Sequence, residues 1–173
     1  MVKTRATEPG ALSHLDGKGR ARMVDVSGKP PVLRLAVARA SVLMKEETIG
    51  LIREGRMPKG DVQAAARIAG IMAAKKTPDL IPLTHPIAIS QAALDIRLDE
   101  RKHSIEIEAS VKVVGETGVE MEALTAACVA ALTVYDMCKA VDREAVISDV
   151  MLVEKSGGKS GTYKRKTKKQ RRI

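Results

Sequence analysis

The chain contains a carboxylate and a lysine placed where they could transfer protons. Asp136 directly follows thirteen uncharged residues, 123–135, and Lys139 comes three residues later. If this stretch is helical, the two side chains lie together on one surface. The helix dipole disfavours a carboxylate near the C-terminus, so its pKa should rise unless a cation lies beside it. A proton-transfer pair and a simple salt bridge both fit these residues.

Two further carboxylates, Glu120 and Glu122, open the same predicted helix. The segment 117–120, Thr-Gly-Val-Glu, has the pattern of a capping box, with threonine as the N-cap. Glu122 and Asp136 share a helical face, yet they are separated by about 21 Å along the axis. Either the ligand is long, or the site combines opposite ends of helices from two chains. The uncharged middle of the helix favours two chains.

A second lysine and a histidine occupy stiff or capped positions. Lys59 lies two residues before Asp61, the predicted N-cap of another helix. It could bind an anion together with the helix N–H groups, or it could be a solvated lysine paired with Asp61. His85 lies in the proline-flanked loop 82–86, which would fix the direction of its imidazole. This suits an acid, a base or a phosphate ligand, but a surface histidine in a rigid turn fits equally well.

A glycine-rich segment, SGGKSG at 156–161, resembles a phosphate-binding loop. The Walker pattern requires a glycine five positions before Gly158, where this chain has Val153. Lys155 and Lys159 nevertheless add positive charge to a turn rich in backbone N–H groups. An anion contact and an ordinary surface turn both remain open.

Hydrophobic periodicity predicts a mixed fold that would carry these residues. The apolar positions indicate helices and strands in the order β-α-α-β-β-α-β. This order is that of an α+β ferredoxin-like sandwich, an antiparallel sheet packed by helices, with one extra helix. The predicted segments are a strand from Val32, helices 45–55 and 61–76, a proline-rich loop 77–87, strands 94–98 and 105–113, a helix 119–141 and a strand 146–154.

The predicted helix 119–141 is apolar on every side and contains six alanines. A helix that is apolar all round is buried all round, and one sheet in a chain of this size could cover only part of it. Alanines permit close approach between helices. We therefore expect this helix to pack against a second subunit as well as against its own sheet.

Charge is distributed unevenly along the 173 residues. The chain has 30 lysines and arginines against 21 acids, a net charge of +9. Residues 164–173 hold seven of the basic residues and no acid, so the rest carries only +2. This tail could contact nucleic acid, which makes a small RNA-binding protein an alternative. Two aromatic residues are too few for a stacking platform, so nucleic acid is otherwise not expected as a partner.

The cysteines, the histidines and the N-terminus bear on compartment and cofactors. Cys128 and Cys138 would lie about 15 Å apart on one helix, too far for a disulfide within the chain. Free thiols, the lack of a signal sequence and the lack of a membrane-length apolar run favour a cytoplasmic protein. The cysteines and histidines show no metal-ligand spacing.

The chain divides into three predicted parts. We expect a flexible arm at 1–22, a single catalytic domain at 23–163 and a disordered basic tail at 164–173.

Four stretches of the sequence closely resemble the cyclic pyranopterin monophosphate synthases, the C proteins of molybdenum cofactor biosynthesis. They are MVDVSGKP (23–30), KGDVQAAARIAGIMAAKKTPDLIPLTHP (59–86), GETGVEMEALTAACVAALTVYDMCKAV (115–141) and KSGGKSG (155–161). The resemblance implies a lyase that converts 3′,8-cyclo-7,8-dihydroguanosine 5′-triphosphate to cyclic pyranopterin monophosphate and pyrophosphate. It implies a homohexamer, a trimer of dimers with sites at subunit interfaces. It implies no redox cofactor and leaves open whether Mg²⁺ accompanies the triphosphate.

The resemblance also implies roles for individual residues. By position, Asp136 matches the family's catalytic aspartate, Lys139 its companion lysine and Lys59 a second catalytic lysine. The implied substrate-binding residues are Leu83, Thr84, His85, Glu120, Met121, Glu122 and Lys155. Many relatives have cysteine in place of Thr84, so a thiol there cannot be essential. An oligomeric structural module without an active site is a further alternative, because the uncharged helix alone would suit it.

Overall fold

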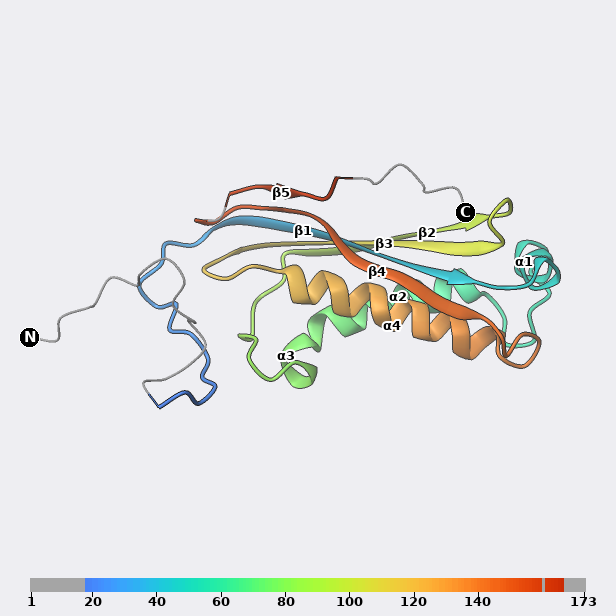
Figure 1. Cartoon of the computed structure of the whole chain (residues 1–173), viewed down its shortest axis with the longest axis horizontal. Helices are drawn as coiled ribbons and strands as arrows, with labels where there is room; N and C mark the ends of the chain where they lie inside the picture. The colour runs from blue at the N-terminus through green and yellow to red at the C-terminus, as the bar shows by residue number, and fades with distance from the viewer. Residues whose placement is uncertain (1–17, 160, 167–173) are drawn as a thin grey trace, which may run out of the picture.

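The computed structural model describes residues 18–159 and 161–166, in which the two longest helices lie on one face of a single sheet (Figure 1). The helices and strands in chain order are β1 (Val32–Leu43), α1 (Glu46–Arg53), α2 (Val62–Lys75), α3 (Thr77–Leu80), β2 (Gln91–Asp99), β3 (Ser104–Gly115), α4 (Glu120–Cys138), β4 (Val146–Ser156) and β5 (Tyr163–Lys164).

The sheet has five strands in the order β2-β3-β1-β4-β5, and every neighbouring pair is antiparallel. Helices α2 and α4 contact each other and pack against the same face of the sheet (Figure 1). The first four strands and these two helices have the connectivity of a ferredoxin-like sandwich, with α1 as the extra helix. The predicted α+β architecture is therefore confirmed.

Small side chains let α4 lie close to the sheet. Ala36 and Ala38 of β1 and Ala126 and Ala130 of α4 are completely buried. A Cβ at Gly70 of α2 would overlap the side chain of Leu94, so α2 also approaches its neighbours too closely for a larger residue. This close packing fills the core with aliphatic atoms and explains how the chain folds with so few aromatic residues.

Helix α4 is long and apolar enough to cross a membrane by length and composition. In the structure 56% of its most apolar 18-residue window is buried inside the fold. It contacts β1, β3, β4 and α2, which is the environment of a core helix. The apolar composition of α4 is therefore explained in part by the packing within one chain.

The start of α4 differs from the predicted capping box. The N-cap is Val119 rather than Thr117, and no side chain caps the first turn. The Glu120 carboxylate accepts a hydrogen bond from Lys155 Nζ of β4 at 2.8 Å. The ion pair with β4 thus takes the carboxylate that a capping box would have turned back to the helix backbone. The helix also ends at Cys138, earlier than predicted.

The proline-rich segment 77–87 was predicted to contain no helix, and this prediction is wrong over its first turn. Residues Thr77–Leu80 form α3, with a proline in the first turn. Proline is tolerated there because the first N–H groups of a helix have no partner within it. The remainder of the segment is a loop, as predicted, and it carries His85.

Most of the two predicted terminal segments lies outside the described residues, namely 1–17 and 167–173. The predicted start of the disordered tail is nevertheless wrong. Lys164 belongs to β5, pairs with Glu154 in the β4 register, and places its Nζ 3.2 Å from the Glu154 carboxylate. A backbone ladder and an ion pair therefore hold the first residue of the basic segment against the sheet.

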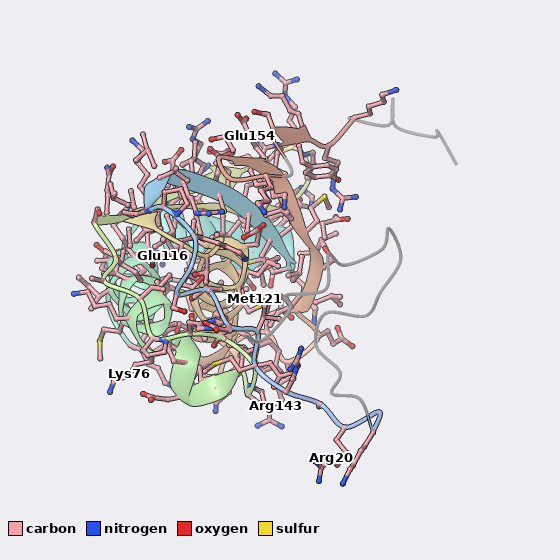
Figure 2. The ribbon with its side chains drawn as sticks, turned by 90° about the vertical axis from the view of Figure 1, so that its left-hand side faces the viewer. Arg20, Lys76, Glu116, Met121, Arg143 and Glu154 are labelled. Carbon is pink, nitrogen blue, oxygen red and sulfur yellow. The ribbon has the colours of Figure 1, made fainter. Side chains whose placement is uncertain are left out.

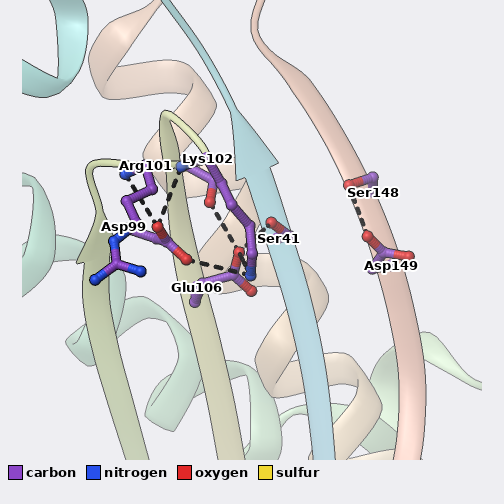
Figure 3. A network of polar contacts seen from close by, with 8 residues as sticks. Ser41, Asp99, Arg101, Lys102, Glu106, Ser148 and Asp149 are labelled. Atoms are coloured by element: carbon purple, nitrogen blue, oxygen red, sulfur yellow. Dashed lines mark hydrogen bonds and ion pairs between the residues drawn. The ribbon is translucent and has the colours of Figure 1, made fainter. Parts of the chain in front are cut away.

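The face of the sheet opposite the helices is polar, as the alternating pattern predicts. Arg39 of β1 and Glu108 of β3 form an ion pair at 2.7 Å. At the β2–β3 hairpin Lys102 lies between Asp99 and Glu106, and Ser41 of β1 donates to Glu106 (Figure 3). These groups are mostly solvent-exposed, so each pair stabilises the fold by at most about 1 kcal/mol.

Candidate functional site

A cavity of about 440 Å³ opens where α4 begins. Figure 2 views the molecule from this end, with Met121 near the centre and Glu154 at the upper edge. Five separate segments converge on the cavity, because strand ends, the proline-rich loop and the start of α4 meet at this edge of the sheet. The residues that line the cavity include Val24, Lys29, Arg34, Leu83, Thr84, His85, Glu116, Glu120, Met121, Glu122, Lys155, Gly157 and Lys159.

The cavity contains all seven of the predicted substrate-binding residues. Four cationic side chains, from Lys29, Arg34, Lys155 and Lys159, also line it. Lys155 is held by the Glu120 carboxylate at 2.8 Å, and both side chains are about three-quarters buried. The cavity therefore presents several positive groups, one of them rigidly positioned, to an anionic ligand.

Glu122 is a buried acid at the floor of this cavity. Only 2% of its surface is exposed, and burial raises the pKa of its carboxyl, to which the charge of Glu120 adds. A hydrogen bond from its own backbone N–H acts in the opposite direction. A carboxyl with a raised pKa in a cavity can hold and release a proton, which is the property required of an acid–base group.

Arg34 is a cavity-lining residue that the sequence interpretation missed. Its Nε and Nη2 atoms donate to the carbonyls of Gly115 and Glu116, each at 2.8 Å. On its other side, a Cβ at Gly158 would overlap the guanidinium, and Gly158 has a φ of +77°. Arg34 therefore joins the glycine-rich loop to the segment before α4. No motif marked it, because a single arginine in an alternating strand resembles any solvent-facing residue.

The proline-flanked loop does position His85. Its Nε2 atom lies 2.8 Å from the backbone carbonyl of Val24, a partner that can only accept. Nε2 is therefore the donor in this contact. Thr84 donates from its hydroxyl to the Ile81 carbonyl at 2.9 Å, which closes the turn that carries the histidine. The interpretation of His85 as a positioned group is supported, because loop and ring are both held by hydrogen bonds.

A second cluster lies at the other end of α4. Asp136 contacts Lys59 Nζ at 2.6 Å and Lys139 Nζ at 2.7 Å. The interpretation of Lys59 as a partner of Asp61 is wrong, since Asp61 instead caps α2 by accepting from the Ala64 N–H. Hydrogen bonds from Lys139 and Lys59 lower the pKa of Asp136 to about 2. The helix dipole therefore does not raise the pKa of Asp136, because two cations lie beside the carboxylate.

The predicted site residues therefore form two groups in one chain. The substrate-binding residues line the cavity at the start of α4, and the predicted catalytic residues Asp136, Lys139 and Lys59 gather near its end. The rise of a helix puts Glu122 and Asp136 about 21 Å apart. The cluster around Asp136 is about half exposed to solvent, so a single chain does not enclose it.

The raised pKa of Glu122 should make the stability of the protein depend on pH, and Glu122→Gln should remove this dependence. An unfolded glutamate titrates near 4.5, whereas the folded carboxyl keeps its proton to higher pH. Stability of the wild type should therefore fall as pH rises from about 4.5 through the folded pKa, because the folded state binds more protons there. Glu122→Gln should lack this fall and be the more stable protein at pH 8. Urea unfolding across pH would contradict this if the two curves stayed parallel.

The described residues, 18–159 and 161–166, contain no group of three or more His, Cys, Asp or Glu side chains arranged to hold a metal ion. The two cysteines are free, as predicted. Burial raises the pKa of the Cys138 thiol to about 11. Cys138 is therefore a packed thiol of low reactivity.

Comparison with known proteins now adds to the geometry. A family model described as the MoaC family matches residues 23–158. A protein of Roseiflexus sp. (strain RS-1) named cyclic pyranopterin monophosphate synthase is 61% identical over 152 residues, which cover 88% of this chain and 96% of that protein. Proteins of the same name from Thermomicrobium roseum and Thermoanaerobacter sp. (strain X514) are 58% and 59% identical. These alignments cover 89% of this chain and 93% and 98% of those proteins. The chain therefore belongs to the MoaC family.

Proposed function

We propose that the protein is a lyase that converts 3′,8-cyclo-7,8-dihydroguanosine 5′-triphosphate to cyclic pyranopterin monophosphate and pyrophosphate in molybdenum cofactor biosynthesis. The observation that carries this proposal is the cavity, where four cations, an imidazole and a buried acid surround a volume of about 440 Å³. That volume lies within the range of small-molecule sites. Relatives about 60% identical to this chain are named cyclic pyranopterin monophosphate synthase, which supports the same activity.

The triphosphate would bind among the cations of the cavity. Lys155 is braced by Glu120, and Lys159 lies in the glycine-rich loop beside it. Lys29 approaches from the segment before β1, and Arg34 lies between the loop and the start of α4. Charge-assisted hydrogen bonds from such groups stabilise the negative charge that grows on departing pyrophosphate.

The phosphate chemistry is a displacement at the α-phosphorus. A hydroxyl oxygen of the substrate forms a new bond to phosphorus, its proton passes to a base, and pyrophosphate leaves with the electrons of the broken P–O bond. Opening and rebuilding the purine-derived ring requires further proton transfers. Glu122, through its raised pKa, and His85, whose ring is held through Nε2, are the cavity groups suited to them.

Asp136 would act through its two lysines. A carboxylate with a pKa of about 2 is a weak base, so its first role is to hold Lys59 and Lys139 as a pair of cations. Two ammonium groups fixed at one carboxylate can supply a proton or neutralise phosphate charge. Loss of the carboxylate would release both of them.

The two clusters would meet in an assembly of subunits. The outer face of α4 begins at Met121 and ends at Asp136, and it exposes 56% of Leu132 between them. On the neighbouring α2, Ile68 and Met72 are about 60% exposed and extend this apolar surface. Antiparallel packing of two α4 helices about a two-fold axis would bury this surface and bring the Asp136 end of one chain to the cavity of the other.

The remaining features of the proposal concern assembly and setting. We propose a homohexamer built as a trimer of such dimers, located in the cytoplasm. No resident redox cofactor takes part in the proposed reaction, and Mg²⁺ would enter only with the triphosphate. In this proposal the catalytic domain does not bind nucleic acid. Contacts between nucleic acid and the basic tail are left to experiment.

Turnover of the cyclised guanosine triphosphate tests the proposed function. Purified protein should release pyrophosphate and cyclic pyranopterin monophosphate in equal amounts, followed by an enzyme-coupled pyrophosphate assay and by mass spectrometry. GTP itself serves as the control, because it lacks the 3′,8 bond and should not react. Unchanged substrate after prolonged incubation with the hexameric protein would refute the proposal.

A further inference from the structure

The glycine-rich loop of the cavity is the turn of a hairpin that the last strand closes. The loop leaves β4 at Ser156, and β5 returns along the outer edge of β4 (Figure 1). Within the turn, the Gly161 N–H donates to the Gly158 carbonyl at 3.2 Å. The family model ends at residue 158, so β5 lies beyond the matched region. The cavity wall that carries Lys155 and Lys159 is therefore held at its far end by residues outside that region.

Several contacts hold this returning segment against β4. The Arg165 N–H donates to the Val153 carbonyl and its Nε to the Leu152 carbonyl, both at 2.8 Å. Lys164 adds the ion pair with Glu154. Such a short strand has little stability of its own, so these side-chain and backbone contacts decide whether it stays in place.

The register of the hairpin places Tyr163 beside Lys155. The two residues are directly opposite in the β4–β5 ladder, and opposite residues share a face of the sheet with Cβ atoms about 5 Å apart. That face is the helix side, because Lys155 reaches Glu120 of α4. Lys164 lies on the other face, toward Glu154. Tyr163 is therefore the β5 residue on the cavity side, and 39% of its surface is exposed.

We propose that β5 is a clasp for the phosphate-binding part of the cavity, with Tyr163 as a positioning residue that restricts Lys155 and the glycine-rich loop. This inference rests on the proposed function, because it assigns Lys155 and the loop to the triphosphate. The clasp lowers the freedom that the loop would lose on binding, so it favours substrate binding more than the chemical step. Its signature is a change in KM at nearly constant kcat.

Two substitutions and two truncations test the clasp in the full hexameric protein. Tyr163→Ala should raise KM for the cyclised triphosphate about tenfold and weaken inhibition by free pyrophosphate equally, with kcat within about twofold of wild type. Tyr163→Phe should restore KM, because the ring supplies the packing. Removal of 163–173 should match Tyr163→Ala or exceed it, whereas removal of 167–173 should leave KM unchanged.

Lys166→Ala is the matched control, because it removes an exposed cation beside β5 while the β4–β5 ladder, the Lys164–Glu154 ion pair and the Arg165 hydrogen bonds stay in place, so KM should be unchanged. A normal KM in both Tyr163→Ala and the longer truncation would overturn the clasp. An equal rise in KM after the shorter truncation would also overturn it, since the charged tail would then be responsible. Pyrophosphate binding to unmodified protein, measured by calorimetry, is independent of turnover. Tight binding without turnover would reject the proposed function while leaving the clasp measurable.

Discussion

Asp136→Asn should lower kcat for pyrophosphate release by about 10³-fold while the proposed hexamer stays intact. The asparagine side chain is nearly the same size, but it carries no charge to hold Lys59 and Lys139. The two ammonium groups would then repel each other and move apart. Since the carboxylate is half exposed and its ion pairs within residues 18–159 and 161–166 are with these two lysines, folding should be little affected.

Steady-state kinetics and size-exclusion chromatography measure the two parts of this prediction. Asp79→Asn is the matched control, because Asp79 also forms an ion pair with a lysine three residues away, Lys76, but at a more exposed position outside the site. It should retain normal kcat. Turnover within about tenfold of wild type in Asp136→Asn would contradict the assignment of the cluster to catalysis.

The same variant has a pH signature in stability. The folded pKa of Asp136 is about 2 and the ordinary value is 3.8. A lowered pKa stabilises the folded state above pH 3.8, and this stabilisation is lost as pH falls through about 2. The unfolding curves of wild type and Asp136→Asn should therefore converge at the acid end. A constant difference across that window would show that the two lysines do not stabilise the charge.

Asp142→Ala should reduce the free energy of unfolding by about 3 kcal/mol, because its carboxylate is buried and accepts several hydrogen bonds. Asp142 is 1% exposed and accepts hydrogen bonds from the Lys45 N–H at 2.8 Å, the Thr48 hydroxyl at 3.2 Å and the Glu144 N–H at 3.1 Å. It thereby caps the start of α1 from a distant part of the chain. Alanine would leave the buried Thr48 hydroxyl and the two partly buried N–H groups without this acceptor.

Thermal and urea unfolding measure this loss, which corresponds to a drop in Tm of about 10 °C for a domain of this size. Asp99→Ala is the matched control, because Asp99 also accepts two backbone N–H groups but lies at an exposed hairpin. Its loss should be under about 1 kcal/mol. Equal losses in the two variants would contradict the role of burial at Asp142.

The sequence predicted the architecture well because its signals were local. Alternating apolar residues marked β2 and β3, and Asp61 marked the start of α2, so each element could be recognised within a few residues. The apparent capping box at Thr117 was equally local but wrong. Its glutamate forms an ion pair with Lys155, thirty-five residues away, and no local pattern records such a competitor.

The site was predictable only in part for the same reason. The resemblance identified Asp136 and Lys59, but their contact joins residues 77 positions apart, and spacing alone favoured Asp61 as the partner of Lys59. Arg34 became visible only when β1, the glycine-rich loop and the start of α4 were brought together. The pKa of Asp136 likewise depends on Lys59, which the helix sequence does not contain. The site features that the sequence did not reveal are therefore those that depend on contacts between residues far apart in the chain.

Subunit mixing tests most directly the central claim, that the cavity of one chain and the Asp136 cluster of another form one active site. His85→Ala should inactivate the cavity, and Asp136→Asn should inactivate the cluster. Unfolded together in equal amounts and refolded, they should recover about one quarter of wild-type activity. Half of the dimers would be mixed, and each mixed dimer would contain one intact site and one doubly altered site. Recovery no greater than the sum of the two variants alone would contradict a shared site.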